Sequence, residues 1–421
     1  MKYWLFYFVN TLLVLPLRVF IRRLYIGGEE NYPKGKPVML ASTHPNSFFD
    51  GVVFEHFYFF RKMFSLARGD AFKKSMPNKI LRSMMLLPIY RARDAKAQAA
   101  RQGNARTYDE CYDRFKKDDT ILIFPEGISK PIKEIERLKK GTGAIAVDMA
   151  KRSDFKMDLK VVPTAINYSK FGGMRRTIHI SFDKPINALG YKKEIEEDEM
   201  KVYTDITNRI ATSLNANFVV TKGEHFIEKE FGHEMLINEN AKPLSFIIKE
   251  QWKGSVKKLN NLTQEGLTKI SVYKKQLEQH KVLDANVKHT GFDYISMFIA
   301  IVTFAISFPV YLIWLAIWKI VVWGCHKKIT NPTFIDSVII GSAMILSTFL
   351  FIGVAIFFYN TTPSFWPIIF TIASIYGALS WFRLADDLPY LWKDLKWMSL
   401  ADHKRKELEN KRAEIMQLLK D

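Results

Sequence analysis

Between residues 30 and 215, short apolar runs alternate with longer charged stretches, and this alternation constrains the fold more than any other feature of the chain. The apolar runs have the length of buried strands and occupy residues 37–41, 62–66, 120–124, 160–167 and 177–182. Helical patterns fill the gaps between them, at residues 50–60, 78–85, 95–115 and 141–151. Strands separated by helices of this length predict an α/β domain with a mixed, largely parallel sheet flanked by helices.

The composition narrows the choice of partners. Lys and Arg number 62 against 43 Asp and Glu, which gives a net charge of +19. A chain this basic binds either nucleic acid or an anionic membrane surface. The sequence has no RNA-binding signature, zinc-finger spacing or basic zipper, so we expect no nucleic-acid partner. The two cysteines, Cys111 and Cys325, lie far apart, which argues against a disulfide framework and favours a reducing compartment for the globular part.

Residues 1–29 are expected to form a helix at the membrane interface. Their apolar run is rich in aromatic residues and is interrupted by Asn10, Pro16 and Arg18. No small-residue cleavage site follows the run, so a removed signal peptide is not predicted. Aromatic side chains at headgroup depth suit a helix that lies in the interface, and a full span is the alternative.

Residues 291–383 are predicted to be a membrane section, which follows an amphipathic helical region at 216–290. Three apolar runs in this section are each long enough to cross a bilayer. They occupy residues 295–323, 334–359 and 365–382. Basic residues precede the second run and follow the third, so the positive-inside rule favours a hairpin of these two spans. The first run is split by Pro309 and would re-enter the membrane or lie shallowly in it.

This hairpin predicts a multi-pass membrane protein whose α/β domain, residues 30–215, lies on the cytoplasmic side. Residues 384–421 then form a charged, helical cytoplasmic tail. An arrangement with three spans would place either the tail or the α/β domain on the opposite side of the membrane.

His44 and Asp50 are the first candidates for chemistry. His44 follows a predicted strand, and sites of α/β proteins gather at the carboxyl ends of strands. An imidazole ionises near neutral pH, so it is the side chain best suited to take a proton from an alcohol. Asp50 begins a predicted helix, where its carboxylate can hold one ring nitrogen and stabilise the imidazolium. Isolated pairs of this kind are common on protein surfaces, so the surrounding sequence decides whether the His44–Asp50 pair is catalytic.

Four blocks of sequence occur in order around this pair. They occupy residues 42–50 (STHPNSFFD), 87–94 (LPIYRARD), 124–130 (FPEGISK) and 161–163 (VVP). Their order resembles the signature of the glycerol-3-phosphate and 1-acylglycerol-3-phosphate acyltransferase superfamily. Five residues separate His44 from Asp50, one more than in the usual first block. This spacing resembles the fungal-type glycerol-3-phosphate/dihydroxyacetone-phosphate acyltransferase branch, whose members also carry a membrane section after the catalytic domain.

The resemblance implies that residues 30–215 are a catalytic domain that moves a fatty acyl chain from acyl-CoA or acyl-ACP onto a glycerol hydroxyl. In that role His44 is the general base and Asp50 orients it. The acyl thioester is a co-substrate, and the resemblance implies no cofactor and no metal. The chain also lacks a G-x-S-x-G motif, which agrees with direct transfer without a covalent acyl-enzyme.

Basic residues are the expected phosphate-binding groups. Arg91 matches the arginine of the second block, and Arg93 lies on the same face if the segment is extended. Two guanidinium groups can hold a phosphate dianion through bidentate hydrogen bonds, and a solvated basic face is the alternative. Arg68 and Lys130 are further candidates for the phosphate, with solvated positions as their alternative.

Glu126 and Gly127 match the third block. The glycine permits close backbone approach at a turn. Glu126 can accept a hydrogen bond from a glycerol hydroxyl or hold the arginine side chains. A glutamate that only stabilises the turn is the alternative.

We therefore predict a membrane-bound O-acyltransferase that acylates glycerol-3-phosphate in phospholipid synthesis. Acylation of 1-acylglycerol-3-phosphate to phosphatidic acid is the alternative with the same chemistry. A non-catalytic lipid-binding protein on the same fold is a third hypothesis, and a serine or metal hydrolase lacks the necessary motifs. The expected partners are membrane lipids, acyl-CoA or acyl carrier protein, and the glycerol phosphate acceptor.

Overall fold

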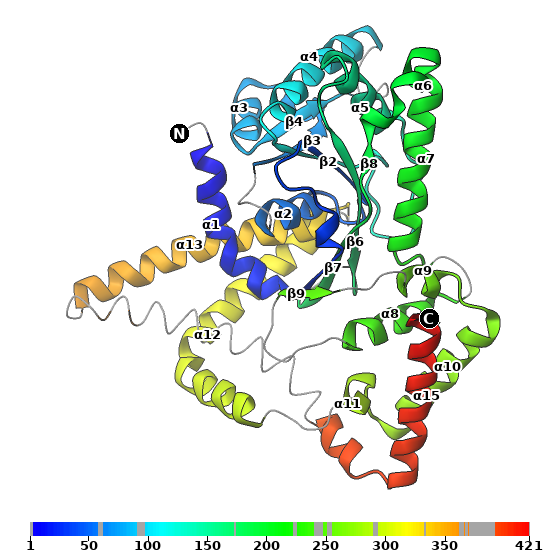
Figure 1. The fold of residues 1–421 in the computed structure, drawn as a ribbon. Helices are drawn as coiled ribbons and strands as arrows, with labels where there is room; N and C mark the ends of the chain where they lie inside the picture. The colour runs from blue at the N-terminus through cyan, green and yellow to red at the C-terminus, as the bar shows by residue number, and fades with distance from the viewer. Residues whose placement is uncertain are drawn as a thin grey trace.

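One mixed sheet forms the centre of the protein, with helices on both faces and a helical portion beside it (Figure 1). The computed structural model describes residues 3–57, 62–90, 97–171, 174–221, 225–239, 247–250, 255–288, 294–331, 334–361, 366, 369 and 392–420.

Nine strands of the described residues make up the sheet, in the order β4-β3-β5-β2-β6-β7-β1-β9, with β8 paired to β6. They are β1 (Ile21–Gly27), β2 (Val38–Ser42), β3 (Met63–Arg68), β4 (Leu86–Ile89), β5 (Thr120–Ile123), β6 (Lys160–Tyr168), β7 (Arg176–Phe182), β8 (Ile186–Asn187) and β9 (Ile247–Glu250). Neighbouring strands run parallel except where β6 meets β7 and β8. The predicted α/β fold with a mixed, largely parallel sheet is therefore confirmed.

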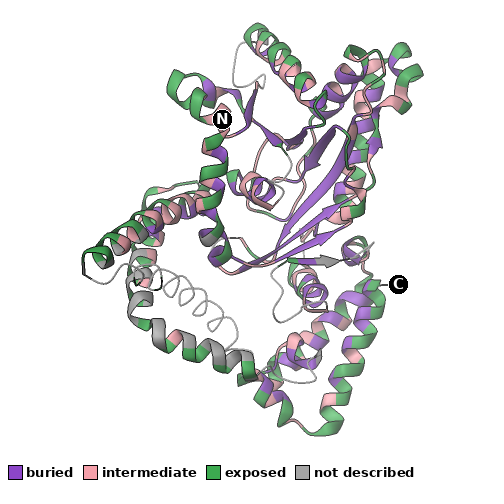
Figure 2. Ribbon diagram, turned by 60° about the vertical axis from the view of Figure 1, so that its left-hand side comes forward, coloured by how far each residue is buried: buried purple, intermediate pink, exposed green. Residues whose placement is uncertain are grey.

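The central strands are apolar on both faces because helices cover both faces of the sheet. In β2, Met39 and Ala41 belong to one buried cluster, while Val38 and Leu40 belong to the other. The first cluster includes side chains of α4 (Ala97–Phe115), α5 (Gly141–Arg152) and α7 (Glu199–Asn217). The second includes side chains of α1 (Trp4–Phe20), α2 (Phe48–Phe57), α12 (Tyr294–Lys328) and α13 (Ile335–Thr361). Figure 2 shows the buried strands between these two layers.

Shorter helices connect the main elements. They are η1 (Glu29–Asn31), η2 (Gly69–Phe72), α3 (Ser75–Ser83), η3 (Ala188–Tyr191) and α6 (Lys192–Glu197). Beyond them, five helices share a separate buried cluster. These are α8 (Phe226–Glu239), α9 (Ser255–Asn260), α10 (Gln264–His280), α11 (Asp284–Lys288) and α15 (Asp402–Lys420). The predicted amphipathic region and the C-terminal tail therefore pack against each other.

Two strands lie where the sequence predicted only helix. β1 falls within residues 1–29, and β9 falls within residues 216–290. β1 pairs with β7 on one side and β9 on the other, so the sheet begins at Ile21 rather than after residue 29. The two arginines in β1 hid the strand, because its remaining apolar residues look like the end of the preceding helix.

One helix among the described residues, Ile335–Phe357 in α13, is long and apolar enough to cross a membrane. Much of the surface of α12 and α13 is exposed (Figure 2). α12 runs as one helix across Pro309, although Figure 1 shows a change of direction partway along it. Most of the run at 365–382 lies outside the described residues, so the predicted hairpin and the number of spans stay predictions.

Candidate active site

Three strand ends bring the site together. β2 lies between β5 and β6, and all three run parallel, so their carboxyl ends share one edge of the sheet. The segments after β2 and β5 supply His44 and Glu126, and the last residue of β6 is Tyr168. Residues far apart in sequence therefore meet at the edge where α/β proteins place their sites.

The His44 imidazole and the Asp50 carboxylate form a hydrogen-bonded pair. His44 Nδ1 lies 3.0 Å from Asp50 Oδ2; the side chain of His44 is 17% exposed and that of Asp50 is 0% exposed. The backbone N–H of Asn46 donates to the same oxygen at 2.8 Å. Within the described part of the chain, His44 Nε2 makes no hydrogen bond. A ring held at Nδ1 with Nε2 unengaged has the geometry of an oriented base.

The extra residue in the first block is accommodated by a turn. Ser47 adopts a left-handed backbone conformation with φ of 50°. Its N–H donates to the Ser129 hydroxyl at 2.7 Å, which ties the turn to the third block. The Asp50 N–H then bonds the Ser47 carbonyl at 3.1 Å as α2 begins. The longer spacing thus still delivers Asp50 to His44.

Tyr168 completes the surroundings of Asp50, and it belongs to none of the four sequence blocks. Its hydroxyl donates to Asp50 Oδ1 at 2.5 Å. Burial and the neighbouring carboxylate raise the pKa of this phenol well above its ordinary value, so Tyr168 stays protonated and acts as a donor. Both oxygens of the buried carboxylate are therefore satisfied. The only signal in the sequence was the position of Tyr168 at the end of a strand.

Glu126 supports the loop that carries His44. One carboxylate oxygen accepts the His44 backbone N–H at 2.9 Å, and the other accepts the Glu136 N–H at 3.1 Å. Burial raises the pKa of Glu126, and the two backbone donors oppose that shift. The observed contacts of Glu126 are thus with the backbone of its own chain, which matches the turn-stabilising alternative for this residue.

The rest of the third block forms the wall beside the imidazole. The Phe124 ring stacks on His44, with centroids 3.8 Å apart and an interplanar angle of 14°. Gly127 has φ of 66°, a conformation that other residues rarely adopt, and this explains the glycine at this turn. Stacking and turn together fix the plane of the ring.

The structure describes two of the four predicted phosphate-binding residues. Arg91 and Arg93 lie outside the described residues, just beyond β4. Arg68 forms a bidentate pair with Asp70 at 3.1 and 2.6 Å and is exposed. Lys130 pairs with Glu136 and is also exposed. Arg68 and Lys130 are thus paired surface cations in this structure.

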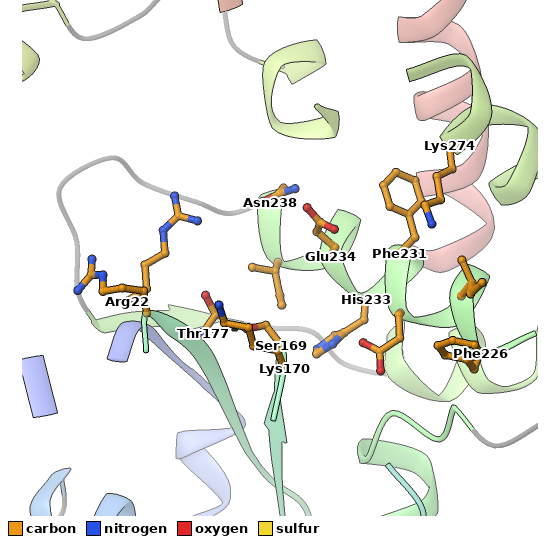
Figure 3. Close-up of a pocket in the computed structure, with 14 residues that line it drawn as sticks. Arg22, Ser169, Lys170, Thr177, Phe226, Phe231, His233, Glu234, Asn238 and Lys274 are labelled. Carbon is orange, nitrogen blue, oxygen red and sulfur yellow. Dashed lines mark hydrogen bonds between the residues drawn. The ribbon is translucent and has the colours of Figure 1, made fainter. Parts of the chain in front are cut away.

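A pocket of about 450 Å³ lies elsewhere and contains none of the predicted site residues. Ser169 and Thr177 line it, and they alternate along their strands with Tyr168 and Arg176, so the pocket opens on the opposite face of the sheet. Figure 3 shows Arg22 on the strand side of this pocket and Glu234 extending from α8. Both cationic and anionic side chains line this pocket, so its charge favours neither an anionic nor a cationic ligand.

Comparison with known proteins agrees with the geometry of the site. Residues 23–167 match the protein-family model described as Acyltransferase, and this range contains all four sequence blocks. Among solved structures, the chain is similar to the 1-acyl-sn-glycerophosphate acyltransferase PlsC from Thermotoga maritima. The two share 19% identity over 49% of this chain and 79% of that chain, with a TM-score of 0.32. No curated protein sequence matches the chain. Membership of the fungal-type branch stays a prediction. The family match confirms the predicted resemblance to acyltransferases: residues 23–167 form an acyltransferase domain, and the protein is an acyltransferase.

Proposed function

We propose that the protein is a membrane-bound O-acyltransferase that transfers a fatty acyl chain from acyl-CoA or acyl-ACP to glycerol-3-phosphate. The observation that carries this proposal is the His44–Asp50 pair, in which a buried carboxylate holds Nδ1 and no described residue bonds Nε2. An alcohol is a poor nucleophile until a base removes its proton, and an oriented imidazole supplies that base.

In this mechanism His44 Nε2 takes the proton of the acceptor hydroxyl as the hydroxyl oxygen attacks the thioester carbonyl carbon. The tetrahedral intermediate collapses, the carbon–sulfur bond breaks, and the imidazolium returns the proton to the leaving thiolate. The products are an oxygen ester and the free thiol of the carrier. Asp50 stabilises the imidazolium between the two proton transfers, and Tyr168 holds Asp50 in place.

The phosphate of the acceptor requires cations near His44. Arg91 and Arg93 are proposed for this role because they follow β4, whose carboxyl end lies at the same edge of the sheet as that of β2. The one-residue-longer first block favours glycerol-3-phosphate as the acceptor, through the resemblance described above. Phosphatidic acid synthesis from 1-acylglycerol-3-phosphate is the outcome that competes with it.

The proposed location is a membrane, with several spans and the catalytic domain on the cytoplasmic side. α1 exposes Trp4, Tyr7 and Phe8, while its Leu17 and Phe20 pack in the protein interior. α13 exposes apolar side chains along its length, among them Phe349 and Ile356. Exposed apolar surface on two adjoining helices suits a bilayer, in which the acyl donor and the product both dissolve.

An assay of the purified protein with both acceptors and both donors tests the proposal. We expect labelled acyl chains in 1-acylglycerol-3-phosphate when glycerol-3-phosphate is supplied. Label found solely in phosphatidate would reject glycerol-3-phosphate as the acceptor and leave the chemistry intact. No transfer with any donor and acceptor would reject the glycerolipid acyltransferase function.

A further inference from the structure

The first turn of α13 reaches the loop that carries His44. Asp336 in this turn is buried, and its Oδ2 accepts a hydrogen bond from the Asn46 side-chain amide at 2.9 Å. Arg176 Nη1 donates to the same oxygen at 2.5 Å and is also buried. In Figure 1, α13 starts near α2 beside the sheet and crosses α1 as it leads away from it.

Asn46 connects Asp336 directly to the His44–Asp50 pair. Its side chain binds Asp336, and its backbone N–H donates to the Asp50 oxygen that holds the His44 ring. Asn46 itself is buried, and these two contacts hold it together with the hydrogen bond that its carbonyl accepts from the Phe49 N–H. A residue 290 positions away in sequence therefore fixes the loop between the base and its partner.

Arg176 provides a second connection. Because β7 runs antiparallel to β6, its first residue lies at the same edge as the end of β6. The Arg176 guanidinium lies over the rings of Phe20, Phe49 and Tyr168, at 4.9, 5.5 and 5.9 Å from their centroids. Tyr168 in turn donates to Asp50. Asp50, Tyr168, Arg176, Asp336 and Asn46 thus form a closed ring of contacts.

The charges in this ring depend on each other. A buried guanidinium needs a buried anion, and removing one partner leaves an uncompensated charge at high cost. Among the residues that the structure describes, the ionisable groups around His44 are Asp50 on α2, Glu126 after β5, Tyr168 on β6, and the Arg176–Asp336 pair beyond them. Without Asp336, the positive charge of Arg176 would oppose a second positive charge on the imidazole.

We propose that Asp336 is a positioning residue, through which the first turn of α13 holds the His44–Asp50 pair in its active arrangement. The C-terminal section is then part of the catalytic apparatus as well as a membrane anchor. This inference rests on the proposed function for its kinetic consequence, but its effect on His44 is measurable without turnover.

The test compares Asp336→Asn with wild type in two measurements on the purified full-length protein. The first is acyl transfer, where we expect kcat to fall by about tenfold or more with little change in KM, because Asp336 touches no substrate. The second is the pH dependence of His44 modification by diethyl pyrocarbonate, followed by peptide mass spectrometry. We expect its midpoint to move to lower pH by about half a unit or more, because Asp336→Asn removes a negative charge beside Arg176 and the positive charge that remains disfavours the imidazolium.

Asp284→Asn is the matched control, because Asp284 is also buried against an arginine, Arg412, in the separate helical cluster. It should lower stability and leave the His44 midpoint at the wild-type value. Asn46→Ala is the second variant and keeps the Arg176–Asp336 ion pair, so it remains informative if Asp336→Asn does not fold. We expect Asn46→Ala to lower kcat with an unchanged midpoint.

Wild-type kcat and midpoint in a folded Asp336→Asn protein would overturn the positioning role. Wild-type kcat in Asn46→Ala would overturn it as well. A wild-type protein without transfer would instead reject the proposed function, and the His44 midpoint in Asp336→Asn would still decide the role of Asp336.

Discussion

At the scale of single residues, the site is built around one fully buried carboxylate. Asp50 receives hydrogen bonds from the His44 ring, the Asn46 backbone and the Tyr168 hydroxyl. Three donors fix the position of this carboxylate beside the imidazole. The orientation of the base therefore depends on residues that never contact the substrate.

Tyr168→Phe tests this dependence. The change removes one donor from Asp50 and nothing from His44, so we expect kcat to fall by about three- to tenfold, the equivalent of roughly 1 kcal/mol. Tyr203→Phe is the control, because the Tyr203 hydroxyl bonds Glu199 on α7, away from the site. Steady-state kinetics of both variants would show the difference, and equal rates would argue against a role for Tyr168.

Glu55 makes a separate prediction about pH. Burial raises its pKa to about 7, and the hydrogen bond from Ser65 only partly opposes this shift. The folded protein holds the proton on Glu55 more tightly than the unfolded chain does. Protonated Glu55 therefore makes its full contribution to the free energy of unfolding below the ordinary pKa of 4.5. This contribution is lost as pH rises through about 7.

Glu55→Gln should therefore be more stable than wild type at pH values above about 7, by up to about 3 kcal/mol. The two proteins should have similar stability near pH 4.5, where Glu55 is protonated. Melting temperatures in detergent across this pH range measure the difference. Parallel profiles of melting temperature against pH for the two proteins would exclude Glu55 as the source of this pH dependence.

The sequence predicted some site residues and not others for a physical reason. His44 and Asp50 lie close in sequence, so a strand end and a helix start were enough to bring them together. Tyr168, Arg176 and Asp336 reach the same site only through strand order and the packing of α13, which local patterns do not encode. Glu126 lies beside His44, but its contacts are with backbone N–H groups, and its predicted role in substrate binding stays a prediction.

At the scale of elements, close packing of α5 against α7 supports the sheet from behind. A Cβ on Gly143 would lie 2.8 Å from the Tyr203 carbonyl oxygen and 2.9 Å from its Cα. Gly143→Ala should therefore lower the free energy of unfolding by about 1–3 kcal/mol, because the two helices must separate. Gly141→Ala is the control, since nothing lies within 4 Å of its added carbon. Urea or thermal unfolding distinguishes them, and equal stability would refute the tight approach.

Elements with a strong pattern were predicted well. The five expected strands all occur within a few residues of their predicted positions, because buried parallel strands are continuous apolar runs. β1 and β9 were missed because each lies within a longer segment of helical character, and because two arginines interrupt the apolar pattern of β1. The pairing of β1 with β7 and with β9 comes from the tertiary fold.

At the scale of the whole molecule, the catalytic sheet, α1 and α13 form one packed body. The apolar helix Ile335–Phe357 begins inside this body, at Asp336, and then exposes its apolar side chains. We therefore expect the protein to stay in the membrane pellet after alkaline carbonate extraction. Immunoblotting of pellet and supernatant measures this, and release into the supernatant would contradict a spanning helix.

His44, oriented by Asp50, is proposed to be the base that activates the acceptor hydroxyl. The most direct test is the initial rate of acyl transfer to glycerol-3-phosphate by purified wild type, His44→Ala and the exposed control His403→Ala. We predict a loss of at least about 100-fold in kcat for His44→Ala, with membrane binding retained and His403→Ala at the wild-type rate. A folded His44→Ala protein that transfers acyl chains at the wild-type rate would contradict the account.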